Sequence, residues 1–105
     1  MSALRRYEIL LPLRFNDGKP VPDALISQTL ADLETRFGAV SWDTQSVRGL
    51  WHYAEKTFSD DLMRVIIDVK DLPGHREFFR GLKGRLKKRF HQLELNMTTH
   101  LIDVV

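Results

Sequence analysis

The sequence contains no cysteine among its 105 residues. Disulfide frameworks, CxxC redox pairs and thiolate metal sites are therefore excluded, and a reducing compartment suits the chain. No stretch approaches the ~20 consecutive apolar residues of a membrane-spanning helix. Residues 1–13 place arginines before an apolar run, but Glu8 interrupts that run and Pro12 ends it, unlike a signal peptide. We expect a cytoplasmic protein with no membrane contact.

Catalytic and metal-binding motifs are equally scarce. No serine lies in a GxSxG motif, and the histidines are not spaced as ligands of one metal. His52 and His100 are expected on opposite edge strands, ~14 Å apart at ~4.8 Å per strand spacing. The sequence therefore indicates no metal site, no cofactor and no catalytic residue, and it favours a binding role over an enzyme.

What the chain has in abundance is positive charge in one segment. The net charge is +2, yet residues 74–92 carry seven basic side chains and one acidic one. The rest of the chain is mildly acidic. With 43% hydrophobic and 29% charged residues, the composition is that of a globular protein, and the length suits one domain over residues 1–105.

The order of periodic segments predicts the fold. Apolar or β-branched runs typical of strands alternate with segments of helical periodicity. Asp71 and Pro73 suit the start of the second helix, and Gly38 suits the end of the first. Strands are expected at 7–15, 46–53, 62–70 and 93–105, and helices at 21–38 and 73–92. This order is the α+β, ferredoxin-like βαββαβ plan: a four-stranded antiparallel sheet, first and third strands central, with two helices on one face.

Side-chain matching suggests a register for the two middle strands. Trp51 would face Val65 beneath the helices, shielded from water, and the other face of the sheet would stay open. On that open face the register pairs His52 with Arg64, Leu50 with Ile66, and Arg48 with Asp68. The last pair would be a cross-strand ion pair.

The open face is the first candidate site. It would have an apolar centre of Leu10, Leu50 and Ile66, ringed by Glu8, Arg48, His52, Arg64 and Asp68. Apolar patches rimmed by charge mark interaction sites, and a two-fold homodimer is the commonest use. A cleft for a small anionic ligand held by an arginine is a second use. A small enzyme built on the Arg, His and Asp side chains is an alternative.

The basic helix is the second candidate site. Its core face carries Phe78, Phe79, Leu82, Leu86, Phe90 and Leu93, and Arg85 and Arg89 follow one flank. Arg76, Arg80, Lys83 and Lys87 follow the other flank. A solvated amphipathic helix is favoured, with contact to an acidic neighbouring subunit left open. A nucleic-acid-binding accessory protein is the alternative, through this polyanion-binding stripe.

Two nucleic-acid-binding families are set aside on their residues. Gly81 and Gly84 satisfy the GxxG spacing of KH domains, but the apolar stripe runs through them without the break that a KH loop requires. An RRM needs aromatic residues on the open sheet face, and residues 62–70 contain none.

These segments together resemble a group of small uncharacterised bacterial ferredoxin-like α/β proteins. The resemblance covers nearly the whole chain, with Thr35 standing where a glutamate is expected. It rests on YEILLPLRFNDG at 7–18, TRFG at 35–38, Trp51, residues 64–68 and RFHQ at 89–92. It implies the fold and supplies no activity. The leading interpretation is a binding or assembly module that self-associates through its open sheet face.

Overall fold

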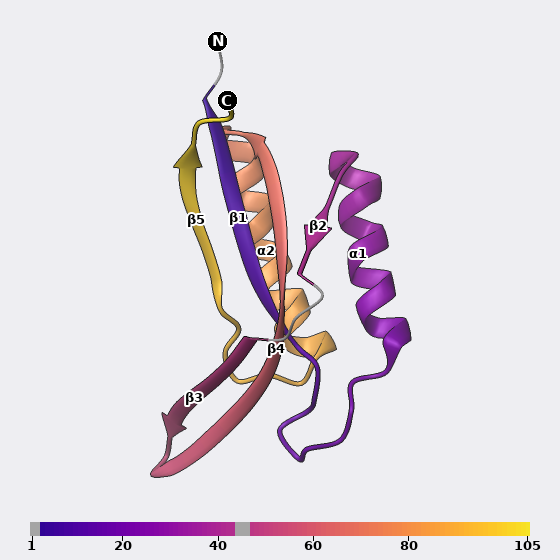
Figure 1. Cartoon of the computed structure of the whole chain (residues 1–105), viewed down its shortest axis with the longest axis vertical. Helices are drawn as coiled ribbons and strands as arrows, with labels where there is room; N and C mark the ends of the chain where they lie inside the picture. Colours follow the sequence, from indigo (N-terminus) through magenta and orange to yellow (C-terminus); the bar gives the residue numbers. More distant parts are fainter. Residues whose placement is uncertain (1–2, 44–46) are drawn as a thin grey trace.

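The computed structural model describes residues 3–43 and 47–105 and has the predicted ferredoxin-like α+β architecture (Figure 1). Its elements are β1 (Leu4–Pro12), α1 (Asp23–Phe37), β2 (Ser41–Trp42), β3 (Val47–Tyr53), β4 (Lys56–Lys70), α2 (Pro73–Arg89) and β5 (Met97–Ile102). No helix in the described ranges is long and apolar enough to cross a membrane.

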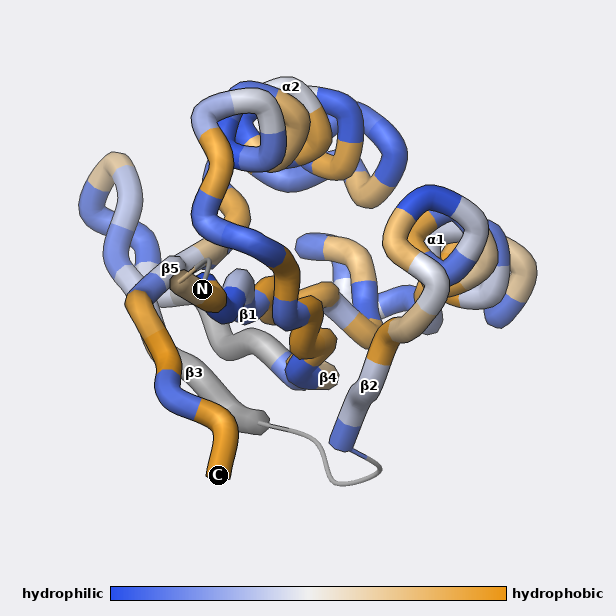
Figure 2. Tube along the Cα trace, turned by 90° about the horizontal axis from the view of Figure 1, so that it is seen from above, coloured by the Kyte–Doolittle hydropathy of each residue, from blue (hydrophilic) through white to orange (hydrophobic). Residues whose placement is uncertain are grey.

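The sheet is antiparallel, with the strand order β2-β4-β1-β5, and β3 pairs with the far half of β4. The two central strands are β1 and β4, as predicted. Both helices lie on the same side of the sheet (Figure 2). The other side is the open face.

The core follows from alternation in the central strands. Side chains from every second residue of β1 and β4 point toward the helices. In β1 these are Tyr7, Ile9 and Leu11, and in β4 they are Met63, Val65, Ile67 and Val69, all buried. The helices cover them with Leu33 of α1 and with Phe79, Leu82 and Leu86 of α2, joined by Phe90, the C-cap residue of α2. The predicted core stripe of the second helix is confirmed, except that Leu93 lies beyond α2 and is 50% exposed.

The helices end and begin close to where the sequence predicts, but the predicted N-cap of α2 is wrong. α1 stops at Gly38, whose φ of 82° is left-handed and whose N–H donates to the Glu34 carbonyl. Pro73 opens α2, but the preceding cap residue is Leu72. The predicted cap, Asp71, instead forms an ion pair with Arg5 at 2.8 Å. α2 runs unbroken to Arg89, so the loop that a KH clamp requires is absent from this described segment.

The predicted register of the middle hairpin is wrong by seven residues. Leu50 pairs with Ser59 rather than Ile66, and Trp51 pairs with Phe58 rather than Val65. The cause is a two-residue turn at Ala54 and Glu55, with φ of 51° and 64°. Positive φ at both positions is the geometry of the tightest hairpins, whose twist matches that of the flanking strands. The β3–β4 hairpin therefore projects beyond the rest of the sheet (Figure 1).

A short strand that the sequence did not reveal, β2, pairs with the part of β4 where β3 was expected. Ser41 pairs with Ile66 and Trp42 with Val65 in β2. The tryptophan beside Val65 is thus Trp42, and Trp51 lies out on the hairpin, only partly buried.

Truncating a buried core residue and truncating Trp51 on the hairpin should lower the free energy of unfolding by different amounts. Phe79→Ala should lower the free energy of unfolding by ~3–5 kcal/mol, the range for buried aromatic residues. Trp51→Ala should lower it by about 1 kcal/mol, the average for single substitutions. Urea denaturation at low protein concentration measures both, because self-association would add to the apparent stability. Equal losses would support the register in which Trp51 is a core residue.

Candidate functional site

Five of the eight predicted open-face residues lie together in the body of the sheet. The pairing of β1 with β4 sets Glu8 opposite Ile66 and Leu10 opposite Arg64, on the side away from the helices. Asp68 follows on the same face, opposite Arg6. Leu10 and Ile66 are partly buried there.

The charges of this face are paired differently from the prediction. Asp68 receives two hydrogen bonds from Arg6, from Nε at 2.8 Å and from Nη2 at 3.0 Å. This pairing raises the pKa of Arg6, chiefly through the hydrogen bonds to Asp68. Arg64 lies 3.4 Å from Asp43. The predicted pair between Arg48 and Asp68 is wrong, because the register sets Arg48 opposite Asp61.

The other predicted residues lie on the hairpin. Leu50 is displaced by seven residues along β4 from its expected partner, about 23 Å at ~3.3 Å per residue. It is 77% exposed. His52 Nδ1 lies 3.0 Å from the Thr57 hydroxyl. The apolar centre is therefore not assembled as predicted, and neither is the Arg, His and Asp cluster of the enzyme alternative.

Because the register differs from the predicted one by an odd number of residues, the described side chains of β3 lie on the opposite side of the sheet from the one predicted. Trp51 and Tyr53 pair with even-numbered residues of β4, which share the open side with Ile66. The two rings lie 6.5 Å apart, and Tyr53 is 55% exposed. The open face therefore continues along the hairpin as an aromatic surface.

The two flanks of α2 that the helical periodicity predicted face different neighbours. One flank faces α1, where Arg89 Nη1 donates to the Thr29 hydroxyl at 2.9 Å and Nη2 lies 3.5 Å from Asp32. Arg85 lies over the Phe78 ring, 5.5 Å from its centroid. The residues of this flank are thus used in packing the helices.

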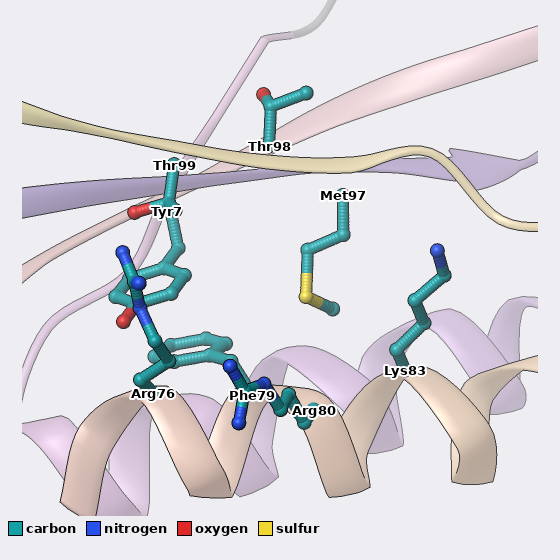
Figure 3. Close-up of a pocket in the computed structure, with 8 residues that line it drawn as sticks. All are labelled: Tyr7, Arg76, Phe79, Arg80, Lys83, Met97, Thr98 and Thr99. Atoms are coloured by element: carbon teal, nitrogen blue, oxygen red, sulfur yellow. The ribbon is translucent and has the colours of Figure 1, made fainter. Parts of the chain in front are cut away.

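The other flank faces the edge strand β5 and borders a cavity of about 300 Å³, the α2–β5 pocket (Figure 3). Arg76 and Lys83 extend from α2 toward β5, and Met97 extends from β5 toward α2. The lining residues are Tyr7, Arg76, Phe79, Arg80, Lys83, Met97, Thr98 and Thr99. Three of the four predicted polyanion-binding residues therefore meet here, and Lys87 lies one turn beyond Lys83.

Most of these cations already have anionic partners. Arg80 lies 2.6 Å from Glu77, and Glu94 lies 3.1 Å from Lys83 and 3.9 Å from Lys87. The pKa of Glu94 is below its ordinary value, first because the Leu95 N–H donates a hydrogen bond to its carboxylate, and further because of the two lysines. Of the four cations on this flank, Arg76 is the one whose side chain has no hydrogen bond or ion pair with a described residue.

Sequence reasoning treated Tyr7, Phe79 and Met97 as fold residues and missed their place beside the basic flank. The signal was present in the strand alternation, which puts Tyr7 and Met97 on the helix side of neighbouring strands. What the sequence could not show is which flank of α2 lies over β5. The described residues contain no group of three or more His, Asp or Glu side chains that could hold a metal ion.

No protein-family model and no curated protein matches the chain. Solved structures match in fold. A phage SAM lyase in complex with S-methyl-5'-thioadenosine has a TM-score of 0.71 at 13% identity, over 99% of this chain and 92% of that one. CutA1 from Oryza sativa matches at 0.59 and 10%, over 99% and 84%. A divalent cation tolerance protein (CutA1) from Thermus thermophilus matches at 0.59 and 11%, over 97% and 86%. These likenesses show a shared ferredoxin-like fold.

The charge pairs beside the pocket predict a titration. Lys83→Gln should raise the pKa of Glu94 only part of the way to its ordinary value, because the Leu95 N–H bond remains. Lys88→Gln should leave the pKa unchanged, since Lys88 forms no ion pair within the described ranges. Carbon-13 NMR of the Glu94 carboxyl group measures both.

The lowered pKa of Glu94 also determines how its contribution to the stability of the fold changes with pH. A carboxylate with a lowered pKa in the folded state stabilises the fold above its unfolded-state pKa and loses that effect as the pH falls through the folded-state pKa. An ordinary Glu94 pKa in the wild type would contradict the pairing.

Proposed function

We propose that this chain is a self-associating binding module, whose copies meet through the open face of the sheet and which holds a small anionic ligand. The observation that carries the proposal is the aromatic pair Trp51 and Tyr53. It extends the open face beyond the core, and Tyr53 is 55% exposed. Tryptophan and tyrosine are enriched where proteins meet, because they combine a large apolar area with a polar group.

The composition of the open face supports contact with a second copy. Leu10 and Ile66 add apolar area in the body of the sheet, on the same side as the aromatic pair and farther along β4. Four charged residues around them pair as Arg6–Asp68 and Arg64–Asp43, whereas Glu8 has no ion pair with a described residue. Two such faces would therefore meet with most of these charges already neutralised. A two-fold dimer needs only this one self-complementary surface.

A small ligand is supported by the fold and by the charge of α2. The phage SAM lyase that shares the fold is in complex with a small organic molecule. Among the described residues, the predicted cluster does not support a reaction, because Asp68, Arg64 and His52 are each engaged with separate partners. A binding role therefore has more support than an enzymatic one.

The nucleic-acid alternative has less support. Three of its four proposed contact residues, Arg80, Lys83 and Lys87, lie beside Glu77 or Glu94. These carboxylates weaken the field that would attract a polyanion, which depends on uncompensated basic charge. A cytoplasmic location and membership of the small bacterial group stay predictions.

Substitutions on the two faces of the hairpin test the association. Ile66→Lys and Tyr53→Lys should each shift the mass in solution to the monomer, because a lysine would bury its charge between the copies. Leu50→Lys is the matched control: it changes an exposed leucine on the other face of the same hairpin, and association should persist. Sedimentation equilibrium measures the mass. A wild-type chain that stays monomeric at its highest soluble concentration would contradict the proposal, and so would dissociation by Leu50→Lys alone.

A further inference from the structure

The α2–β5 pocket is lined by the largely buried side chain of Tyr7. Tyr7 is 3% exposed, and its ring stacks on Phe79 at 3.8 Å between centroids. Its hydroxyl makes no hydrogen bond with any residue in the described ranges. The hydroxyl oxygen keeps contact with solvent, so a bound molecule can replace its water. The Tyr7 side chain lines the pocket, so its hydroxyl is available to a bound molecule (Figure 3).

Arg76 supplies the matching charge. It lines the same pocket, and its guanidinium has neither a hydrogen bond nor an ion pair with any described residue. The other two cations of the lining form ion pairs, Arg80 with Glu77 and Lys83 with Glu94. An arginine presents several N–H groups in a planar fork that fits a carboxylate or phosphate. The pocket thus has one free cation, judged over the residues that the structure describes.

The rest of the lining is apolar or already satisfied. Phe79 and Met97 supply apolar walls. The Thr99 hydroxyl already donates to the Arg6 carbonyl at 2.8 Å, and the Thr98 side chain points away from α2 (Figure 3). Unsatisfied polar groups are therefore confined to Tyr7 and Arg76, and a molecule that fills the pocket needs one polar head and an apolar body.

We infer that the α2–β5 pocket binds a small organic anion: a phosphate or carboxylate group meets Arg76 and the Tyr7 hydroxyl, and an apolar body packs against Met97 and Phe79. This names the ligand site of the proposed binding module and rests on that proposal. The volume of about 300 Å³ is at the lower end of the ~300–1,000 Å³ typical of small-molecule sites. The surrounding positive charge disfavours a metal cation, and an inorganic anion would leave the apolar walls uncovered.

Phenyl phosphate and inorganic phosphate are the probes that test this inference. Both carry the anionic head, and phenyl phosphate adds the apolar body. Titration of each into the full chain is followed by the NMR shifts of the backbone amides. The expected result is that shifts concentrate at 76–83 and 97–99, and that phenyl phosphate binds at least tenfold more tightly. Equal affinities, or shifts spread over both flanks of α2, would overturn the inference.

Variants assign the contacts. Arg76→Gln should weaken phenyl phosphate binding at least tenfold, and Tyr7→Phe, which keeps the ring and its stack, should weaken it severalfold. Glu94→Gln should tighten binding, because it releases Lys83 toward the pocket. Arg85→Gln is the matched control on the other flank and should leave the Kd within twofold. Equal losses from Arg76→Gln and Arg85→Gln would indicate general attraction of anions, as on a nucleic-acid-binding surface, and would overturn the pocket.

The monomer variant separates this inference from the proposed association. Ile66 lies on the open face, away from the pocket. Phenyl phosphate binding by Ile66→Lys with unchanged affinity would support a site within one chain, whatever the fate of the association. A wild type that associates but does not bind phenyl phosphate would overturn the pocket and leave the association standing.

Discussion

The Tyr7 ring on the central strand β1 lies almost parallel to the Phe79 ring of α2, at 12° and 3.8 Å between centroids. Phe37, at the end of α1, stacks in turn with Phe79 at 5.3 Å and 6°. This column of three aromatic rings joins both helices to the middle of the sheet. Because it fixes α2 above β1 and β5, it determines which flank of the basic helix faces the edge strand and leaves the Tyr7 hydroxyl at the pocket.

The orientation of α2 that these rings fix also explains why its basic residues differ between the two flanks. On the α1 side the long basic side chains cover apolar edges and reach across, as Arg85 does over Phe78 and Arg89 does to Thr29. On the β5 side glutamates compensate most of the charge and leave Arg76 uncompensated. A helix that reads in sequence as a simple charged surface therefore has one flank that packs against α1 and one that borders the α2–β5 pocket.

The element order, the central strands and the core faces of β1, β4 and α2 could be predicted, because each rests on the periodicity of a single segment. The hairpin register could not be predicted, because side chains of the two strands match acceptably in more than one register. The turn that decides it, Ala54 and Glu55, contains no glycine or asparagine, the residues that usually announce positive φ. The two-residue strand β2 was too short to show a pattern.

The site residues could likewise be predicted only where a single segment reveals them. The cationic flank Arg76, Arg80 and Lys83 was visible as a helical stripe, and the pocket that it borders was not. That pocket depends on Tyr7 and Met97 from two neighbouring strands, and on the crossing of α2 over the sheet edge, which single-segment patterns do not contain.

A crystal structure of the chain grown with phenyl phosphate tests the central claim most directly, since it locates both parts of the probe. The phosphate is expected between Arg76 and the Tyr7 hydroxyl, with the phenyl ring against Met97. Phosphate bound instead along the outer face of α2, with the pocket free of the phenyl ring, would contradict it.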